Sequence, residues 1–500
     1  MKNLAGIHIL VLGLGHSGLA LARWCARCGA QVTVADTRAE PPQRDALRMS
    51  VPAASFLHGD MSSALLDVAR FDMLLKSPGL SPLDTDAVTA AAKARGMACG
   101  NELSLFGQAL ADLKEDTGYA PQVMGITGTN GKTTVTSMAG QLVKRTGRTV
   151  AVAGNIGPTL LDTLAEKMDA GSLPEVWVLE LSSFQLDGIR SFEPTVATVL
   201  NITQDHLDWH GTFEAYAAAK NNVFGTNGLM LLNRNDPQVM AAVPAQVKGK
   251  PTRSYLTFGH DEPQRPGDYG IQTVNGMAWL VRASEIDETI KRKRGDKCED
   301  IELHIQRLMP VDALRIHGLH NATNALAALA LTHAVGCAMG PILHGLREYK
   351  GEPHRVESVA VIDEVEYFDD SKGTNVGATV AALAGLGAQR KLVVILGGVG
   401  KDQDFSPLAL PVSRFVRAVV LIGRDAPLIG IALKGSGTTL LFAESMQEAV
   451  NFAVRQAQPG DAVLMSPACA SFDMFDNYEH RARIFCDAVH ALALENGVMP

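Results

Sequence analysis

The sequence is poor in cysteine and lacks long apolar runs, and each feature excludes a class of protein. Seven cysteines are scattered along 500 residues, a pattern typical of reduced thiols and not of a disulfide framework. No apolar run approaches the roughly 20 residues that cross a bilayer. Met1 to Leu4 lead directly into a predicted strand. We therefore expect a cytoplasmic protein without membrane insertion.

Large basic clusters are also missing. Lysine and arginine number 45 against 53 acidic residues, a formal net charge of −8, so no nucleic-acid surface is expected and phosphate ligands must be bound by local loops. Cys25 and Cys28 form a lone CxxC on a predicted helix. Without a second pair, zinc or redox chemistry is the minor alternative there. The length predicts about three domains.

A phosphate-binding loop follows the apolar run Val123 to Thr127. Backbone N–H groups of a glycine turn at a helix start can hold phosphate oxygens, Lys132 adds positive charge, and Thr133 offers a hydroxyl to Mg²⁺. Ile126 stands where the standard loop has a further glycine. The loop is therefore a variant that predicts use of a nucleoside triphosphate. Its residues are Gly128, Thr129, Asn130, Gly131, Lys132, Thr133 and Thr134.

Short apolar runs alternate with helical patterns along nearly the whole chain, which predicts parallel sheets covered by helices on both faces. Turn-prone breaks near residues 119–121 and 350–353 divide the chain into three α/β domains, at 1–119, 120–351 and 352–500. The polar stretch 260–310 is expected to be a solvated surface insertion. The predicted strands are Ile7 to Leu12, Val32 to Ala35, Met73 to Leu75, Val123 to Thr127, Val176 to Glu180, Val196 to Leu200, Leu229 to Leu232, Leu392 to Leu396, Val419 to Ile422, Leu440 to Phe442 and Ala462 to Met465.

A second glycine loop, Gly13-x-Gly15-x-x-Gly18, follows the first predicted strand, and Asp36 ends the next one. This fingerprint fits a nicotinamide dinucleotide, with Asp36 on the ribose. A nucleotide-sugar diphosphate fits it equally well, because any tight turn facing a diphosphate needs the same glycines. The turn Ser77-Pro78-Gly79 follows another strand, at the edge of the sheet where ligands of open α/β sheets bind.

Two side chains at strand ends are candidate metal ligands in the middle of the chain. Glu180 ends an apolar strand, where a carboxylate can face the phosphate loop and bind Mg²⁺. His206 follows the next strand. A structural role and a ligand role remain equally open for this histidine.

Lys220 falls on the apolar face of the helix predicted from Phe213, together with Tyr216 and Phe224. Burial would lower its pKa and favour the neutral amine, which can add CO₂ to become a carbamate ligand of Mg²⁺. The alternative is a lysine that extends its ammonium to water.

An ordered set of motifs runs nearly from end to end of the chain. The motifs are the phosphate loop, Gly154-Asn155-Ile156-Gly157, Glu180-Leu181-Ser182-Ser183-Phe184-Gln185, Asp205-His206-Leu207-Asp208, His320-Asn321-Ala322-Thr323-Asn324-Ala325, Pro353-His354-Arg355-Val356-Glu357, Asp370-Ser371-Lys372-Gly373-Thr374-Asn375 and Gly397-Gly398-Val399-Gly400-Lys401. This set resembles the Mur ligases, ATP-dependent amide-forming enzymes of bacterial peptidoglycan synthesis. The carboxyl-terminal run from Ser466 to Phe475 resembles the members that add D-glutamate to UDP-N-acetylmuramoyl-L-alanine.

The resemblance implies a Rossmann-like UDP-binding domain, a central ATP-binding domain and a C-terminal domain that receives D-glutamate and completes the ATP site. It implies two Mg²⁺ ions, one on Thr133 and Glu180 and one on His206 and carbamylated Lys220, with Lys132 on the phosphates and Asn155 at the acyl phosphate. The ATP contacts implied in addition are Asn321, Asn324, Arg355 and Asp370. The UDP contacts are Gly13, Leu14, Gly15, His16, Ser17, Gly18, Asp36, Thr37, Arg38, Ser77, Pro78 and Gly79. The D-glutamate contacts are Lys372, Thr374, Lys401, Ser471, Phe472 and Phe475.

Three alternatives remain beside a monomeric D-glutamate-adding ligase. Another Mur-type or folylpolyglutamate-type ligase would accept a different amino acid. A nicotinamide oxidoreductase would use Gly13 to Gly18 with Asp36. A nucleotide-gated binding protein would keep the phosphate loop but would not need Glu180, His206 and Lys220 at one place.

Overall fold

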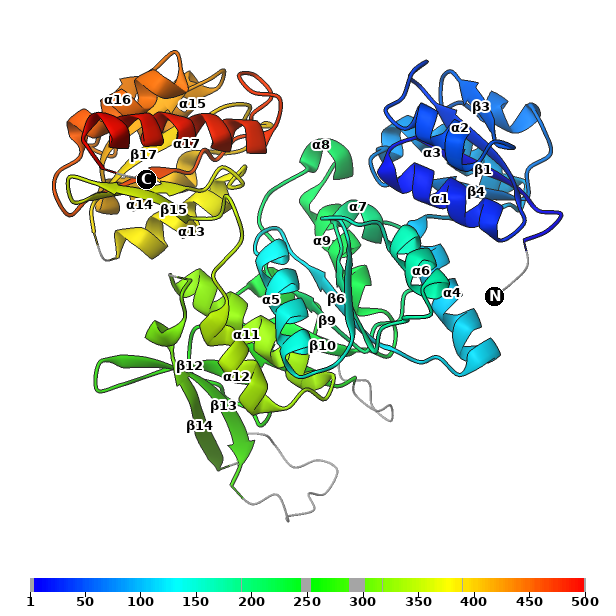
Figure 1. The fold of residues 1–500 in the computed structure, drawn as a ribbon, viewed down its shortest axis with the longest axis horizontal. Coiled ribbons are helices and arrows are strands. Elements are labelled where there is room, and N and C mark those ends of the chain that lie inside the picture. The colour runs from blue at the N-terminus through cyan, green and yellow to red at the C-terminus, as the bar shows by residue number, and fades with distance from the viewer. Residues whose placement is uncertain are drawn as a thin grey trace.

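Three largely parallel sheets lie in three lobes of the protein, whose structure is a computed structural model (Figure 1). It describes residues 4–189, 191–243, 253–286, 302–316, 318–388 and 390–498. The apolar runs form buried strands because helices cover both faces of each sheet. The predicted α/β class is confirmed, and so are all the strands named from the sequence, to within a few residues at each end.

The N-terminal sheet is entirely parallel, in the order β3-β2-β1-β4-β5. Its strands are β1 (His8–Leu12), β2 (Gln31–Asp36), β3 (Ser55–His58), β4 (Met73–Lys76) and β5 (Ala98–Gly100). Its helices are α1 (His16–Arg27), α2 (Arg44–Ser50), α3 (Pro82–Ala94) and α4 (Glu102–Thr117), with a 3₁₀ turn η1 (Ser63–Asp67).

The central sheet is also parallel, in the order β11-β10-β9-β6-β8-β7. Its strands are β6 (Gln122–Thr127), β7 (Val150–Gly154), β8 (Val176–Glu180), β9 (Val196–Val199), β10 (Leu229–Asn233) and β11 (Tyr255–Phe258). The helical elements around it are α5 (Lys132–Arg145), α6 (Leu160–Asp169), α7 (Ser183–Leu186), α8 (Leu207–His210), α9 (Phe213–Asn221), η2 (Asn222–Phe224), α10 (Pro237–Met240), η4 (Val311–Ala313), α11 (Leu319–Ala334) and α12 (Met339–Glu348).

A small antiparallel sheet extends from this central lobe, in the order β12-β13-β14 (Figure 1). Its strands are β12 (Tyr269–Val274), β13 (Met277–Glu285) and β14 (Leu303–Pro310). Tyr269, Leu280 and Met309 are buried in the same core as α11. The expectation of a solvated insertion is therefore wrong for these strands, because one face of the sheet packs on the domain and only the other is polar. The charged run at 291–294 lies outside the described residues.

The C-terminal sheet has the order β15-β16-β20-β17-β18-β19, and only the β15–β16 pair is antiparallel. Its strands are β15 (Glu357–Ile362), β16 (Val365–Asp369), β17 (Leu392–Gly397), β18 (Val416–Ile422), β19 (Thr439–Phe442) and β20 (Ala462–Met465). Its helical elements are α13 (Val376–Gly387), η5 (Ser406–Leu408), α14 (Ala409–Phe415), α15 (Ala426–Leu433), α16 (Met446–Gln456) and α17 (Tyr478–Glu495). None of the helices in the described ranges is long and apolar enough to cross a membrane.

The N-terminal and C-terminal lobes lie on opposite sides of α8, which projects from the central lobe (Figure 1). On the N-terminal side, α1 and α4 pack on α6. Phe106 of α4 meets Trp177 of β8 edge to face, with ring centroids 5.1 Å apart. A continuous apolar core therefore joins these two lobes. The contacts between the C-terminal lobe and the phosphate loop are polar, as described below.

Candidate active site at the phosphate loop

The phosphate loop joins the end of β6 to the start of α5, as predicted. Gly128 and Gly131 have positive φ values of 152° and 84°, conformations that favour glycine. A Cβ on Gly131 would lie 2.7 Å from the Asn324 side-chain oxygen. Asn201 anchors the loop, since its carbonyl accepts a hydrogen bond from the Thr129 N–H (2.9 Å) and its side-chain oxygen accepts one from the Asn130 N–H (2.8 Å).

Two lysines converge on one carbonyl of this loop. Lys132 Nζ donates to the carbonyl oxygens of Gly128 (2.8 Å) and Thr129 (2.9 Å), and Lys220 Nζ donates to the same Gly128 oxygen (2.9 Å). Lys220 is 1% exposed and its ammonium lies 4.5 Å from the centre of the Tyr216 ring. The alternative of a lysine that reaches water is therefore wrong. Burial, and next the charge of Lys132, lower the pKa of Lys220 well below its ordinary value.

Glu180 ends β8 and is 1% exposed. Asn155 Nδ2 donates to Glu180 Oε1 at 2.9 Å. The other oxygen, Oε2, is buried and has no hydrogen-bond partner among the described residues. A buried carboxylate oxygen without a partner is costly unless a cation or a donor approaches it. Glu180 therefore fits a magnesium site, held in orientation by Asn155.

His206 lies just before α8 and has a positive φ of 54°. Its ring packs edge to face on Phe184, with centroids 4.7 Å apart. Burial lowers the pKa of His206 although the adjacent Asp205 opposes this effect. The imidazole is therefore neutral at physiological pH, the form that binds metals. Asp205 in turn lies 3.7 Å from Lys401 Nζ, which comes from the C-terminal lobe.

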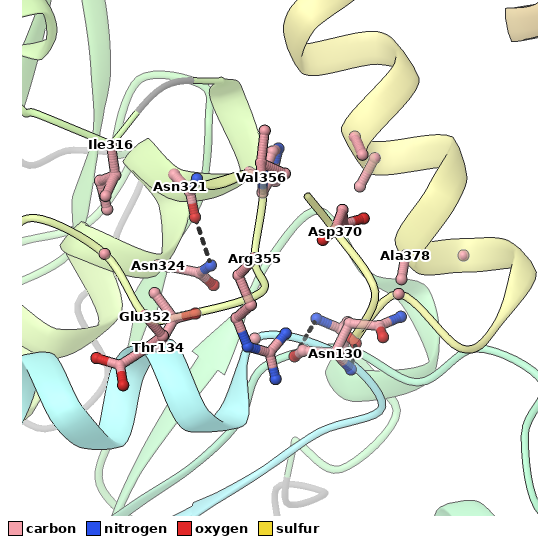
Figure 2. Close-up of a pocket in the computed structure, with 18 of the residues that line it drawn as sticks. Asn130, Thr134, Ile316, Asn321, Asn324, Glu352, Arg355, Val356, Asp370 and Ala378 are labelled. Carbon is pink, nitrogen blue, oxygen red and sulfur yellow. Dashed lines mark hydrogen bonds between the residues drawn. The ribbon is translucent and has the colours of Figure 1, made fainter. Parts of the chain in front are cut away.

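A cleft beside the loop is lined by both the central and the C-terminal lobes. Asn321 and Asn324 come from α11, and Asn324 Nδ2 donates to Asn321 Oδ1 at 3.3 Å (Figure 2). Arg355, in the segment between the lobes, points toward the phosphate loop (Figure 2) and donates to Thr133 Oγ1 at 3.2 Å. Asp370 lines the opposite wall. The structure thus brings together the four residues that the resemblance implied for ATP outside the loop.

Asp370 is a buried acid with a perturbed pKa. Burial raises its pKa to about 7, against the opposing effect of a hydrogen bond from Ser466 Oγ at 2.6 Å. Sequence reasoning missed Ser466 as a partner of Asp370, and it missed Asn375, whose side chain exchanges hydrogen bonds of 3.2 and 3.0 Å with that of Asn130. Both residues lie inside motifs that the sequence analysis named, but their partners are far away in the chain.

The second glycine loop is organised by Asp36, which is 2% exposed. Asp36 Oδ2 accepts from the Leu14 N–H (2.7 Å) and from Arg38 Nη2 (2.9 Å), while Oδ1 accepts from the Arg38 N–H and Nε (both 2.9 Å). These four bonds use the acceptor sites of the carboxylate. Burial opposes ionisation, but the bonds from Arg38 and Leu14 outweigh it and lower the pKa of Asp36 to about 2. A cofactor ribose would have to displace them, which disfavours the nicotinamide alternative.

The residues implied for D-glutamate have different surroundings. Lys372 Nζ lies 5.4 Å from the centre of the Tyr478 ring, and burial lowers its pKa. Ser471 is 2% exposed, whereas Phe472 is 74% exposed. Lys401 contacts the central lobe at Asp205, as described above.

The site combines a phosphate loop, a buried carboxylate at a strand end and a third lobe that completes the cleft. These features define a multidomain enzyme that uses a nucleotide. Three family descriptions match in order: the Mur ligase MurD-like N-terminal domain at residues 7–100, the Mur ligase middle domain at 126–332, and the Mur ligase glutamate ligase domain at 354–469. The chain belongs to the Mur ligase family, and it is an enzyme of the ATP-dependent ligase class.

Relatives cover the whole chain. A UDP-N-acetylmuramoylalanine–D-glutamate ligase of Albidiferax ferrireducens is 63% identical over 99% of this chain and 98% of its own length. One from Ralstonia nicotianae is 55% identical over 99% of both. Among solved structures, MurF ligase of Thermotoga maritima with ADP has a TM-score of 0.58 at 15% sequence identity, and the match covers 99% of this chain and 100% of that one. MurC of the same organism has a TM-score of 0.55 at 19% sequence identity, and the match covers 97% of this chain and 100% of that one. These structures share the fold.

Proposed function

We propose that this protein joins D-glutamate to UDP-N-acetylmuramoyl-L-alanine at the expense of ATP, a step in the synthesis of peptidoglycan precursors. The observation that carries the proposal is the convergence of Lys132 and Lys220 on the Gly128 carbonyl (2.8 and 2.9 Å). A phosphate loop needs one lysine. The second is buried, which lowers its pKa well below the ordinary value, and it is without purpose in a simple binding protein. The full-length relatives named UDP-N-acetylmuramoylalanine–D-glutamate ligase support the choice of substrates.

The reaction proceeds through two bond exchanges. A carboxylate oxygen of the substrate attacks the γ-phosphorus of ATP, and the bond to the β-phosphate oxygen breaks to leave ADP and an acyl phosphate. The amine of D-glutamate then adds to the acyl carbon, giving a tetrahedral intermediate that expels phosphate. Protons leave the amine nitrogen as the amide forms. Such chemistry depends chiefly on positioning and charge neutralisation.

The residues of the loop and cleft would each position a different part of ATP. Lys132 would hold the β- and γ-phosphates with the N–H groups of residues 128–134, and Arg355 would reach them from the third lobe. Asn321 and Asn324 would face the adenine, and Asp370 the ribose. What supports this division is that these side chains line one cleft beside the loop.

Two Mg²⁺ ions would neutralise charge on the transferred phosphate when bound. Thr133 and Glu180 would hold the first, and the unpartnered Glu180 Oε2 supports this assignment. His206 and Lys220 would hold the second. For this role the neutral Lys220 amine would add CO₂ and lose one proton, giving a carbamate whose single negative charge is shared by two oxygens. Asn155 would orient Glu180 and steady the acyl group.

The substrates would enter from the two outer lobes. UDP would bind the glycine loop at residues 13–18, residues 36–38 and the turn at 77–79, where Asp36 fixes the loop and Arg38 adds positive charge. D-glutamate would bind Lys372, Thr374, Lys401, Ser471, Phe472 and Phe475. We further propose that the chain forms three domains, at 1–119, 120–351 and 352–500, and that the protein is cytoplasmic. We propose a monomer, because one chain supplies every residue named.

Phosphate release on mixing ATP, Mg²⁺, UDP-N-acetylmuramoyl-L-alanine and D-glutamate tests the proposal. We expect release only when all are present. L-glutamate, L-alanine and diaminopimelate serve as alternative acceptors, and a Lys132→Met variant serves as the negative control. Release that depends on another amino acid would overturn the assignment, and release that ignores the UDP substrate would point to a nucleotide-gated binding protein.

A further inference from the structure

Lys76 is a half-buried cation at the last position of β4, immediately before the turn at Ser77. Its Nζ lies 5.2 Å from the centre of the Trp209 ring. Burial lowers the pKa of Lys76, and the attraction of Asp187 and Asp86 opposes this effect more weakly. No carboxylate of the described residues lies within ion-pairing distance of Lys76. A desolvated ammonium without a paired anion is unfavourable, so the site favours an anionic ligand.

Trp209, the aromatic partner of Lys76, belongs to the central lobe. It lies on α8, three residues after His206, and α8 packs on α3 of the N-terminal lobe. Trp209 is 9% exposed, and its indole N–H is buried without a hydrogen-bond partner among the described residues. Phe184 packs against its ring, with centroids 4.7 Å apart. The junction of the two lobes thus holds both an unpaired cation and an unpaired donor.

The place of this pair suggests what it binds. Lys76 adjoins the turn at 77–79, where the uridine end of the substrate would lie, and Trp209 adjoins His206, where its carboxylate would react. The substrate is one extended molecule, so the part between its ends must pass this junction. That part consists of a diphosphate and an amino sugar. Ammonium groups bind phosphate oxygens, and an indole offers an apolar face together with one N–H donor.

We propose that Lys76 binds the diphosphate of the UDP substrate and that Trp209 binds its sugar, so that the pair selects a glycosyl nucleoside diphosphate at the junction of the first two lobes. This inference rests on the proposed function. It adds these two residues to the glycine loop in recognition of the diphosphate and the sugar, the middle segment of the substrate. The structural alternative is that Lys76 only packs on Trp209 to hold the lobes together.

Equilibrium binding of three ligands separates these roles. UMP, UDP and UDP-N-acetylmuramoyl-L-alanine are titrated calorimetrically into the wild type, Lys76→Met and Trp209→Phe. Lys76→Met keeps the apolar stem and removes the charge, and we expect it to weaken UDP and the full substrate about 10-fold and UMP less than 2-fold. Trp209→Phe keeps a ring and removes the donor, and it should weaken the full substrate but leave UDP unchanged.

Lys93→Met is the matched control, because Lys93 is an exposed cation on α3 whose charge also acts on Lys76. We expect no change in its three affinities, and Lys76→Arg should restore most UDP binding. Equal losses in Lys76→Met and Lys93→Met, or an equal loss for UMP and UDP, would overturn the proposal. So would a lower melting temperature with unchanged affinities. Binding without turnover in the wild type would reject the proposed reaction alone, whereas a wild type that binds no UDP ligand would reject both.

Discussion

Replacing Lys220 by methionine should raise stability while removing activity. Lys220 is 1% exposed, and its ammonium donates one hydrogen bond within the described structure, to a Gly128 oxygen that Lys132 also uses. Burying Lys220 requires either desolvation of its ammonium or release of a proton to give the neutral amine, which costs several kcal/mol, and one shared acceptor with a nearby tyrosine ring offsets only part of that cost. Methionine has a similar length and no donors. We expect Lys220→Met to unfold with a free energy about 1–3 kcal/mol higher at neutral pH.

The pH dependence of this gain follows from the depressed pKa of Lys220. Between that pKa and the ordinary value of 10.5, the unfolded chain carries a proton that the folded chain lacks. Unfolding then takes up a proton, so the stability of the wild type rises with pH across this range. Lys220→Met has no such group, and its advantage should shrink as the pH approaches 10.5.

Urea unfolding from neutral to alkaline pH in CO₂-free buffer, together with phosphate release at neutral pH, tests both consequences. Activity should fall about 100- to 1000-fold, the loss typical of removing one group that stabilises developing charge. In Lys220→Ala, added formate should restore part of it by supplying a carboxylate in the vacated space. A Lys220→Met protein that is destabilised at every pH would refute the reasoning, because Lys220 would then be a structural residue.

Two further predictions concern the two glycine loops. Gly131→Ala and Gly147→Ala place a side chain at the same φ of 84°, but only at Gly131 does the Cβ meet another group, Asn324. Each substitution should lower the free energy of unfolding in urea by about 1 kcal/mol. Only Gly131→Ala should raise the KM for ATP. Asp36→Asn should weaken UDP binding in calorimetry at least several-fold. It should also have a lower free energy of unfolding than the wild type, because the depressed pKa stabilises the folded protein only while Asp36 is ionised. This difference should be full above pH 3.8 and disappear as the pH falls through about 2.

The sequence predicted the elements that depend on local pattern. The buried strands and the position of the glycine turn between β6 and α5 were predicted correctly, because apolar runs and glycine turns act over a few residues. The environment of Lys220 was predicted in part, since helical spacing put it on the apolar face of α9. Its shared acceptor, Gly128, lies 92 residues away and could not be found from spacing. The β12–β14 sheet was missed because its strands are half-solvated and interrupted by a charged segment.

The contacts between the C-terminal lobe and the phosphate loop explain why local sequence pattern gave no signal for the rest of the site, whose residues were named only through the family resemblance. Asn130 and Asn375 exchange two side-chain hydrogen bonds across 245 residues of chain, and Arg355 reaches Thr133 across 222. Each residue alone is an ordinary polar side chain in a loop or in the first turn of a helix. The cleft exists only when the C-terminal lobe lies on the central one, so its chemistry is a property of docking. Because these bonds are each worth only about 1 kcal/mol, a nucleotide that contacts both walls would add substantially to what holds the lobes together.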